Sequence, residues 1–298
     1  MQYAPIVLFV YRRLGHLKLT INSLKKNKES KKSNLIIFSD GSKNKYDYNS
    51  VIKVRKYINN INGFKNLKII FRKKNFGLAN NLFKGINQVF KRNDKAIVLE
   101  DDIMVSPTFL KYMNLNLKKY EKNLNVASIH GYCYPVKFKN GPENFFFLKG
   151  ADCWGWATWR RAWKKYDNNA NNLIKIINNK KNQRDFDFNF SYPYFDMLKL
   201  TSKKNHSWAI KWYASAFVND MFTLYPKKSF VTNTGNDGSG TNSLFQKMYN
   251  TKNLNKTTKF DKIKVEDNVE ARFLFEKFFN KIYQKKNLFE KLIGLYKK

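Results

Sequence analysis

The sequence predicts an α/β fold with an open, mostly parallel sheet and helices on both faces. Short, continuous apolar runs, typical of strands buried on both faces, alternate with segments whose apolar residues recur at helical spacing. The connections between them are short, as in a parallel sheet covered by helices. With 298 residues, 43% of them hydrophobic and 16% aromatic, the chain can build one large domain with a sizeable core.

Four strands, with a helix between each pair, are expected in the first hundred residues. The apolar runs place the strands at residues 4–10, 35–38, 67–71 and 96–99. The helical positions between them are Leu17, Ile21 and Leu24, then Val51, Val54, Ile58 and Ile61, then Leu78, Leu82, Ile86 and Val89.

The rest of the chain gives a less regular pattern. Ser106 and Pro107 predict a helix start, with serine as the cap and proline in the first turn. Residues 168–184 are rich in Asn and Lys and predict a loop or an irregular helix. The remaining segments are strands at 125–129 and 145–148, a Trp-rich stretch at 150–163, a buried helix at 207–218, a Gly-rich loop at 235–242, a polar segment at 246–268 and a helical tail at 270–298.

Polar residues follow all four early strands. In open parallel sheets, ligands bind beyond the carboxyl ends of the strands, so these side chains are expected to share one edge. They are Arg12 and Arg13 after the first strand, Asp40 after the second, Arg72 after the third, and Glu100, Asp101 and Asp102 after the fourth.

The triplet Glu100–Asp102 indicates a metal site. Carboxylates crowded at the end of a buried strand repel one another, and a divalent cation relieves that repulsion. Hard oxygen ligands favour Mg²⁺ or Mn²⁺, and such an ion can bridge to a diphosphate. The alternative is a solvated acidic turn paired with nearby lysines.

These motifs, in this order, resemble the nucleotide-binding half of GT-A-fold glycosyltransferases of the family-two type, whose sheet is Rossmann-like. The matching motifs are YRR, SDGS, FRKKNFGLANNLFKGI and LEDD. The EDD, in place of Asp-X-Asp, resembles the N-acetylglucosaminyltransferase I branch. Further along, GWATWRRAW, SWAIKWYAS and NTGNDGSGTN resemble the acceptor-side segments of that branch, so the resemblance covers about residues 4–242.

The resemblance implies a single GT-A domain. Residues 1–103 would be its nucleotide-sugar-binding half and 104–245 its acceptor-binding half, followed by a basic amphipathic helical tail at 246–298. The implied activity is metal-dependent transfer of a sugar, with inversion, from a nucleotide-diphosphate donor (a UDP-sugar is favoured) to a hydroxyl of a glycan or lipid-linked acceptor. The implied setting is bacterial surface polysaccharide biosynthesis.

The resemblance also implies roles for single residues. Asp102 would be the direct metal ligand, Asp101 would bond to the ribose or the metal shell, and Glu100 would meet the donor sugar. The remaining donor contacts would be Val10 and Tyr11 beside the base, Arg12 or Arg13 on a phosphate, Asp40 on the base or ribose, and Arg72, Asn75 and Gly77 bordering the base. The alternatives are surface arginines, a turn or cap role for Asp40, and a strand-to-helix turn at Gly77.

An inverting transfer needs a general base on the acceptor side. The resembled branch carries a carboxylate in its Trp-flanked helix, but SWAIKW has none here. Asp152 is the first candidate, and its alternative is an acid bonded to backbone or to Arg160 or Arg161. Asp237 is the second candidate, and would otherwise serve the phosphates or the metal. The nearby Trp154, Trp156 and Trp159 either form an apolar wall for a sugar ring or belong to the core.

The net charge of +35 indicates either an anionic partner or a general bias in composition. A sugar nucleotidyltransferase and a nucleic-acid-binding protein remain alternatives, but YRRLGH is a poor phosphate loop and no nucleic-acid-binding motif is evident. Two Cys exclude a disulfide framework, and the three His have no spacing that indicates a role. The N-terminal apolar run precedes its basic pair, which predicts a first strand, no export signal and a cytoplasmic enzyme.

The C-terminal segment 270–298 places Phe275, Phe278, Phe279 and Ile282 on one helical stripe beside many Lys. One interpretation is a helix lying on an anionic membrane surface, which would put the enzyme on the inner face of the cytoplasmic membrane. The other is a helix that packs its apolar stripe against the domain.

Overall fold

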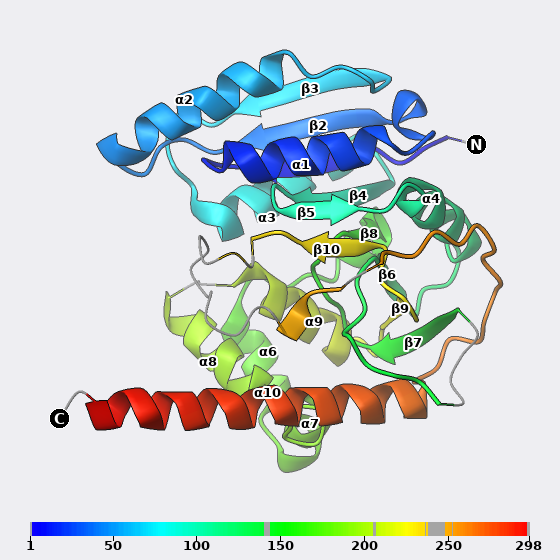
Figure 1. Cartoon of the computed structure of the whole chain (residues 1–298). Coiled ribbons are helices and arrows are strands. Elements are labelled where there is room, and N and C mark those ends of the chain that lie inside the picture. The colour runs from blue at the N-terminus through cyan, green and yellow to red at the C-terminus, as the bar shows by residue number, and fades with distance from the viewer. Residues whose placement is uncertain are drawn as a thin grey trace.

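The computed structural model describes residues 2–139, 144–204, 207–235, 237, 248–251 and 253–296 (Figure 1). The strands are β1 (Ile6–Val10), β2 (Asn34–Ser39), β3 (Asn66–Phe71), β4 (Lys95–Glu100), β5 (Ile103–Val105), β6 (Val126–His130), β7 (Phe145–Lys149), β8 (Trp156–Trp159), β9 (Phe222–Pro226) and β10 (Val231–Asn233). The helices are α1 (Leu14–Lys25), α2 (Lys45–Asn59), α3 (Gly77–Phe90), α4 (Phe109–Lys119), α5 (Arg160–Trp163), α6 (Ala170–Ile177), α7 (Lys180–Phe186), α8 (Tyr194–Lys204), α9 (Trp208–Val218) and α10 (Val269–Tyr296), with a 3₁₀ turn, η1 (Ser30–Lys32).

The predicted mostly parallel sheet is confirmed. Within the described residues it has eight strands in the order β3-β2-β1-β4-β8-β6-β9-β7, and β5 and β10 form a separate antiparallel pair. The pairs among β3, β2, β1 and β4 are all parallel, as is β6 with β9. Strand β8 runs antiparallel between β4 and β6. It comes from the Trp-rich stretch, to which the sequence pattern assigns no strand.

Helices cover both faces of the sheet, as predicted. Alternate residues of β1 face opposite sides, because successive side chains of a strand point in opposite directions. Ile6, Leu8 and Val10 join a core cluster with residues of α1, α2 and α4. Val7 and Phe9 join a second cluster with residues of α3 and α9. Because β1, β2 and β4 are parallel, their carboxyl ends lie at one edge of the sheet, where the polar residues are expected.

Two local predictions need correction. Helix α4 begins at Phe109 and not at Ser106, because the Ser106 backbone N–H donates to the Phe230 carbonyl (2.7 Å) and so ties this residue to the chain before β10. The Asn/Lys-rich segment forms two regular helices, α6 and α7. Their N-cap side chains, Asn169 and Asn179, each accept a hydrogen bond from a backbone N–H of the first turn.

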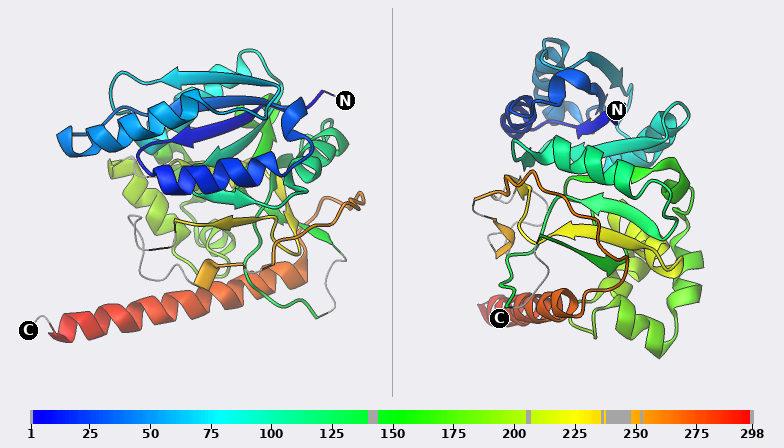
Figure 2. Two further views of the ribbon diagram at one scale, coloured as in Figure 1. Left: turned by 45° about the horizontal axis from the view of Figure 1, so that its top comes forward. Right: turned by 90° about the vertical axis from the view of Figure 1, so that its right-hand side faces the viewer.

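The tail forms α10, which packs against the domain. Ala271, Phe275 and Phe279 are buried in a third core cluster with residues of α6, α8 and α9, and Ile282 is also buried. Figures 1 and 2 show α10 at the end of the molecule opposite β2 and β3. This part of the apolar stripe therefore has a protein partner, which confirms the second interpretation of the tail. Every helix among the described residues is too short or too polar to cross a bilayer.

Phe275→Ala is expected to lower the free energy of unfolding by about 3–5 kcal/mol, because it empties a site where the ring is 1% exposed. The control, Phe273→Ala, removes a ring that is 51% exposed on the same helix and should cost about 0.5 kcal/mol or less. Urea unfolding followed by circular dichroism measures both changes. Equal unfolding midpoints for the two variants would contradict the packing of α10.

Candidate active site

The structure brings the polar residues after β1 and β4 together at one edge of the sheet. The two strands are parallel neighbours, with Phe9 opposite Glu100. The chain therefore leaves both strands side by side, and the acids after β4 lie next to the basic residues after β1. The residues that meet here are Tyr11, Arg13, Asp101 and Asp102.

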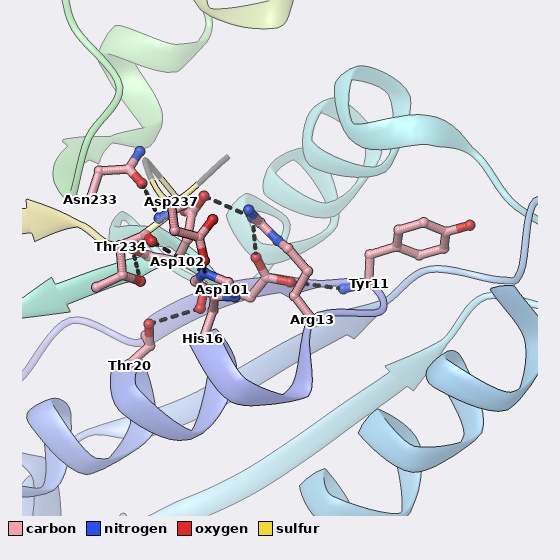
Figure 3. A network of polar contacts seen from close by, with 10 residues as sticks. Tyr11, Arg13, His16, Thr20, Asp101, Asp102, Asn233, Thr234 and Asp237 are labelled. Carbon is pink, nitrogen blue, oxygen red and sulfur yellow. Dashed lines mark hydrogen bonds and ion pairs between the residues drawn. The ribbon is translucent and has the colours of Figure 1, made fainter. Parts of the chain in front are cut away.

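Arg13 bridges two aspartates at this edge (Figure 3). Its Nη2 lies 2.6 Å from Asp101 Oδ1 and 2.7 Å from Asp102 Oδ2. The backbone N–H of Tyr11 also donates to Asp101 Oδ2 (3.3 Å), and the Thr20 hydroxyl donates to the Asp101 carbonyl (2.9 Å). Both aspartates are buried. Their carboxylates are therefore oriented by α1 and by the first residues after β1.

Glu100 adds a third acid to this group. Burial, followed by the charges of Asp102 and Asp101, raises the pKa of Glu100 to about 8. The side chain of Trp208 in α9 hydrogen-bonds to Glu100 and works in the opposite direction. Burial also raises the pKa of Asp101, although Arg13 opposes this shift. Three carboxyl groups thus share one guanidinium, which leaves an excess of negative charge when all three are ionised.

The chain after β10 closes against the same acids. The backbone N–H and the hydroxyl of Thr234 both donate to the Asp102 carbonyl, at 2.8 and 3.0 Å. A Cβ on Gly235 would lie 2.4 Å from Asp102 Oδ2 and 2.8 Å from an Arg13 nitrogen. Only glycine fits at this position without displacing the ion pair. Of the predicted Gly-rich loop at 235–242, only Gly235 and Asp237 are among the described residues.

Asp237 lies next to α1. Its Oδ2 is 3.0 Å from His16 Nε2, and the same nitrogen is 3.2 Å from the Thr234 carbonyl (Figure 3). His16 follows Arg13 by one turn of α1, so both side chains reach the chain after β10. This placement favours the alternative role of Asp237, beside the phosphates or the metal.

Asp40 and Gly77 stabilise a turn between β2 and α3. This is the turn role that the sequence analysis gave as the alternative to binding the base. Asp40 is buried, and its Oδ1 accepts from the backbone N–H groups of Gly41 and Phe76, both at 2.9 Å. Asn75 Nδ2 donates to the Gly41 carbonyl (2.7 Å), and Asn75 Oδ1 accepts from the Gly77 N–H (3.1 Å). Gly77 has φ +71°, a conformation that favours glycine. These contacts join the end of β2 to the start of α3.

Arg12 and Arg13 point to different partners. Arg12 pairs with Asp47 of α2, and the Tyr11 hydroxyl donates to the same carboxylate (2.7 Å). The Arg12 side chain is 53% exposed, whereas that of Arg13 is 26% exposed. Arg13 is therefore the arginine that contacts the acidic triplet. The Val10 side chain is buried in the core, so only its backbone faces the edge.

Arg72 borders the same edge from β3. Its guanidinium carbon lies 5.0 Å from the ring centre of Phe38 and 5.1 Å from that of Phe76. Its Nε donates to Asn81 Oδ1 (2.9 Å), and burial lowers the pKa of Arg72. Its Nη2 is buried and has no hydrogen-bond partner among the described residues. A buried donor of this kind normally has a partner, so Arg72 is an exception that calls for an explanation.

Asp152 accepts hydrogen bonds from two groups, and a buried histidine lies close by. The Tyr134 hydroxyl donates to its Oδ2 (3.3 Å), and the Cys153 backbone N–H donates to its Oδ1 (2.7 Å). Nε2 of the buried His130 lies 3.9 Å from Oδ1, but it accepts from the Trp154 backbone N–H (3.1 Å) and so does not donate to Asp152. The alternative interpretation of Asp152, an acid bonded to backbone or to Arg160 or Arg161, is therefore correct for the backbone contact.

The arginine partners expected in that alternative are wrong. Arg160 pairs with Asp94, and Arg161 donates to the carbonyls of Tyr120, Glu121 and Val126.

Asp152 and the acidic triplet face a common neighbour. Burial raises the pKa of the Cys153 thiol, and the charges of Asp152, Glu100 and Asp102 raise it further. The candidate base and the triplet therefore belong to one region of the molecule.

The tryptophan wall is only partly present. Trp156 and Trp159 are 1% and 2% exposed, and Trp156 stacks with Trp208 in the core, so neither can contact a sugar ring. Trp154 is half-buried and lies 4.7 Å from the ring centre of Tyr132. Trp156 and Trp159 pack into the cores on the two faces of the sheet, because β8 is a central strand.

The acidic edge fits a divalent cation that shares its shell with a ligand. The described residues contain no group of three or more His, Cys, Asp and Glu side chains arranged around a metal position. However, Mg²⁺ and ions like it are commonly bound by one or two carboxylates together with substrate phosphates. Asp101 and Asp102 would supply those carboxylates, and the charge excess around Glu100 would favour a cation.

Several contact residues escape the sequence analysis. His16, Asp47, Tyr134, His130, Trp208 and Thr234 all touch the predicted residues. Only His16 carries a usable signal, because it lies three residues after Arg13 in a helix that starts at the edge of the sheet. The others reach the site from segments far away in the sequence.

Glu100→Gln is expected to stabilise the metal-free protein at alkaline pH. The folded protein holds a Glu100 proton up to a pKa of about 8, while the ordinary value is 4.5. The contribution of Glu100 to stability is therefore complete below about pH 4.5 and is lost as the pH rises through 8. In EDTA, the variant should melt about 2–4 °C above the wild type at pH 9 and at the same temperature at pH 4.5. An identical pH dependence of melting for both proteins would contradict the raised pKa.

Comparisons with known proteins point to one family. The family model described as "Glycosyl transferase family 2" matches residues 6–186. The crystal structure of S. aureus TarS 1–349 is 15% identical over 78% of this chain and 61% of that chain, with a TM-score of 0.41. The structure of TarS 1–349 in complex with UDP-GlcNAc is 12% identical over 78% of this chain and 58% of that chain, with a TM-score of 0.42.

The mannosyltransferase PcManGT from Pyrobaculum calidifontis, in complex with GDP-Man and Mn²⁺, is 10% identical over 55% of this chain and 47% of that chain, with a TM-score of 0.33. The chain thus spans about three fifths of the TarS 1–349 structure. No curated protein sequence matches it. Because the family model covers more than half of the sequence, the chain belongs to glycosyl transferase family 2.

Proposed function

We propose that this protein is a metal-dependent glycosyltransferase that uses a nucleotide-diphosphate sugar, with a UDP-sugar favoured. It transfers the sugar, with inversion, to a hydroxyl of a glycan or lipid-linked acceptor. The observation that carries the proposal is the cluster of Arg13, Asp101 and Asp102 at the carboxyl edge of β1 and β4. Membership of family 2 supports the reaction class.

The division of labour follows the sheet. Residues 1–103 hold the donor and residues 104–245 hold the acceptor. Mn²⁺ or Mg²⁺ would be held by Asp102, with Asp101 beside it, and would neutralise charge on the diphosphate. Glu100 lies next to these acids, at the position assigned to the donor sugar. Arg72 supports the nucleotide end, since its buried Nη2 lacks a partner among the described residues.

Arg13 has two tasks in this scheme. It orients both aspartates through short ion pairs, and it places a permanent positive charge beside the diphosphate position. Arg12 pairs with Asp47 instead, so the phosphate role falls to Arg13. Asp237 and His16 close this side of the site from the segment after β10.

Asp152 acts as the general base. The acceptor oxygen attacks the anomeric carbon, the bond from that carbon to the diphosphate breaks, and the hydroxyl proton passes to the Asp152 carboxylate. Its position beside Cys153, which also feels the charges of Glu100 and Asp102, supports this role. The nucleoside diphosphate leaves with the electron pair of the broken bond.

The setting we propose is bacterial surface polysaccharide synthesis inside the cell. Cys133 and Cys153 are both free thiols, which accords with a reducing cytoplasm. No described feature of the site favours a nucleotidyltransferase or a nucleic-acid-binding protein over this proposal.

Asp102→Asn should lower metal-dependent turnover by about 100-fold or more, because it removes a charged ligand of the cation. A panel of UDP- and GDP-linked sugars with Mn²⁺, scored for transfer and for hydrolysis, measures the effect. Asp94→Asn is the matched control, since Asp94 is exposed and pairs with Arg160 just before β4. Unchanged metal-dependent turnover in Asp102→Asn would show that the metal assignment is wrong.

Asp152→Asn should lower kcat by about 10²–10⁴-fold while leaving the affinity for UDP and Mn²⁺ unchanged, because the base acts after the donor has bound. Turnover and UDP-induced thermal shift are measured on the same preparation. Full activity in this variant would place the base elsewhere, and Asp237→Asn is then the next variant to assay.

A further inference from the structure

Tyr134 connects the candidate base to the C-terminal helix. Its hydroxyl donates to Asp152 Oδ2 at 3.3 Å. Burial raises the pKa of Tyr134 well above its ordinary value, so the phenol keeps its proton and acts as a donor. The other carboxylate oxygen accepts from the Cys153 backbone. Tyr134 therefore supplies a side-chain contact that positions Oδ2 of Asp152.

Three phenylalanines of α10 surround the Tyr134 ring. The ring centres of Phe275, Phe278 and Phe279 lie 4.8, 5.3 and 5.0 Å from that of Tyr134. The contacts with Phe275 and Phe279 are edge-to-face, a geometry that aromatic pairs prefer. The spacing of these residues places them on one face of the helix. The helix therefore sets the position of the Tyr134 ring.

Tyr132 and Tyr249 complete the enclosure. Their ring centres lie 5.3 and 6.1 Å from that of Tyr134, and the Tyr132 hydroxyl donates to the Tyr249 carbonyl (2.6 Å). Tyr249 also packs against Phe278 of α10 and against Trp154, at 5.7 and 5.8 Å. A continuous aromatic layer thus runs from α10 to the residues beside Asp152.

We propose that α10 is a working part of the acceptor side, and that Tyr134 is a positioning residue for Asp152. The helix holds the Tyr134 ring, and the Tyr134 hydroxyl holds the carboxylate. The proposal rests on the proposed function, because it assigns Asp152 as the base. It joins the tail to the acceptor half, although the sequence pattern separates the two at residue 246.

A positioned carboxylate matters because proton transfer requires the base within hydrogen-bond reach of the acceptor hydroxyl. Loss of the Tyr134 hydroxyl leaves Oδ2 of Asp152 without this hydrogen bond. It also removes a donor that stabilises the ionised form of the Asp152 carboxyl group. The donor edge is built from β1, β4 and α1, and Tyr134 lies outside it. The defect should therefore appear in kcat and in the pH profile, and not in nucleotide binding.

The titratable neighbours of Asp152 allow a clean measurement. They are His130 of β6, the thiol of Cys153 and the phenols of Tyr132, Tyr134, Tyr194, Tyr213, Tyr225 and Tyr249. Burial lowers the pKa of His130 and raises the pKa of each phenol and of the thiol. The phenols and the thiol stay neutral across the acidic range in which carboxyl groups ordinarily titrate, and His130 is identical in every variant. Glu100, with its pKa of about 8, is identical in every variant.

The first test needs no substrate. The side-chain carboxyl ¹³C signal of Asp152, identified by its loss in Asp152→Asn, is titrated in wild type, Tyr134→Phe and Phe278→Ala. We expect the midpoint to move upward by about 0.5–1 pH unit in Tyr134→Phe, and in the same direction but less in Phe278→Ala. Phe273→Ala, on the exposed side of α10, should titrate like the wild type. An unmoved midpoint in Tyr134→Phe would overturn the proposal.

The second test measures hydrolysis of the best UDP-sugar of the panel, with water as the acceptor. Tyr134→Phe should lower kcat by about 3–10-fold, leave KM for the donor unchanged and move the acidic limb of the pH profile upward. Phe278→Ala should do the same to a smaller extent, and Phe278→Leu should recover most of the loss by refilling the contact with Tyr134.

The outcomes separate this proposal from the proposed function. If Asp152→Asn is inactive while Tyr134→Phe keeps the wild-type kcat and pH limb, the positioning role fails and the base assignment stands. If Asp152→Asn keeps full activity, the base assignment fails, and the carboxyl titration alone still tests the link from α10. A lower melting temperature in Tyr134→Phe and Phe278→Ala with an unchanged pH limb indicates a purely structural role and overturns the proposal.

Discussion

The site depends on one electrostatic balance, between the carboxyl groups after β4 and the guanidinium of Arg13. Glu100, Asp101 and Asp102 lie where a buried strand ends, and their mutual repulsion is one cause of the raised pKa of Glu100. Arg13 contacts two of these acids directly. It offsets part of their charge and leaves the remainder available to a cation. The surrounding features, including the turn at Thr234 and the glycine at position 235, preserve this arrangement.

The first four strands and three helices could be predicted from the sequence because their signals are local. Continuous apolar runs and helical spacing identify β1 to β4 and α1 to α3, and the rule for ligand sites in open sheets identifies the edge. The sequence does not show which of two adjacent arginines contacts the acidic triplet. Arg12 pairs with Asp47, whereas Arg13 pairs with the acids after β4. That choice follows from the turn of the chain as it enters α1.

The surroundings of Asp152 were harder to predict, because strand β6, the loop after it and the Trp-rich stretch meet there. His130, Tyr134 and Asp152 come from different loops and strands, and no spacing links them. Strand β8 is hidden in a Trp-rich stretch whose two faces are both buried, so it shows no alternation of polar and apolar residues. The C-terminal segment showed a clear apolar stripe at helical spacing. Only the tertiary structure shows that this stripe packs against α6, α8 and α9.

Strand β8 has a consequence for how donor and acceptor meet. It runs backwards between β4 and β6 and is hydrogen-bonded to both. The segment that carries Asp152 leads directly into β8, and the acidic triplet leaves β4 next to it. Backbone hydrogen bonds, and not a flexible linker, therefore determine the spacing between Asp152 and the acidic triplet. Sequence changes in the surrounding loops can then alter what binds between them while this spacing stays constant.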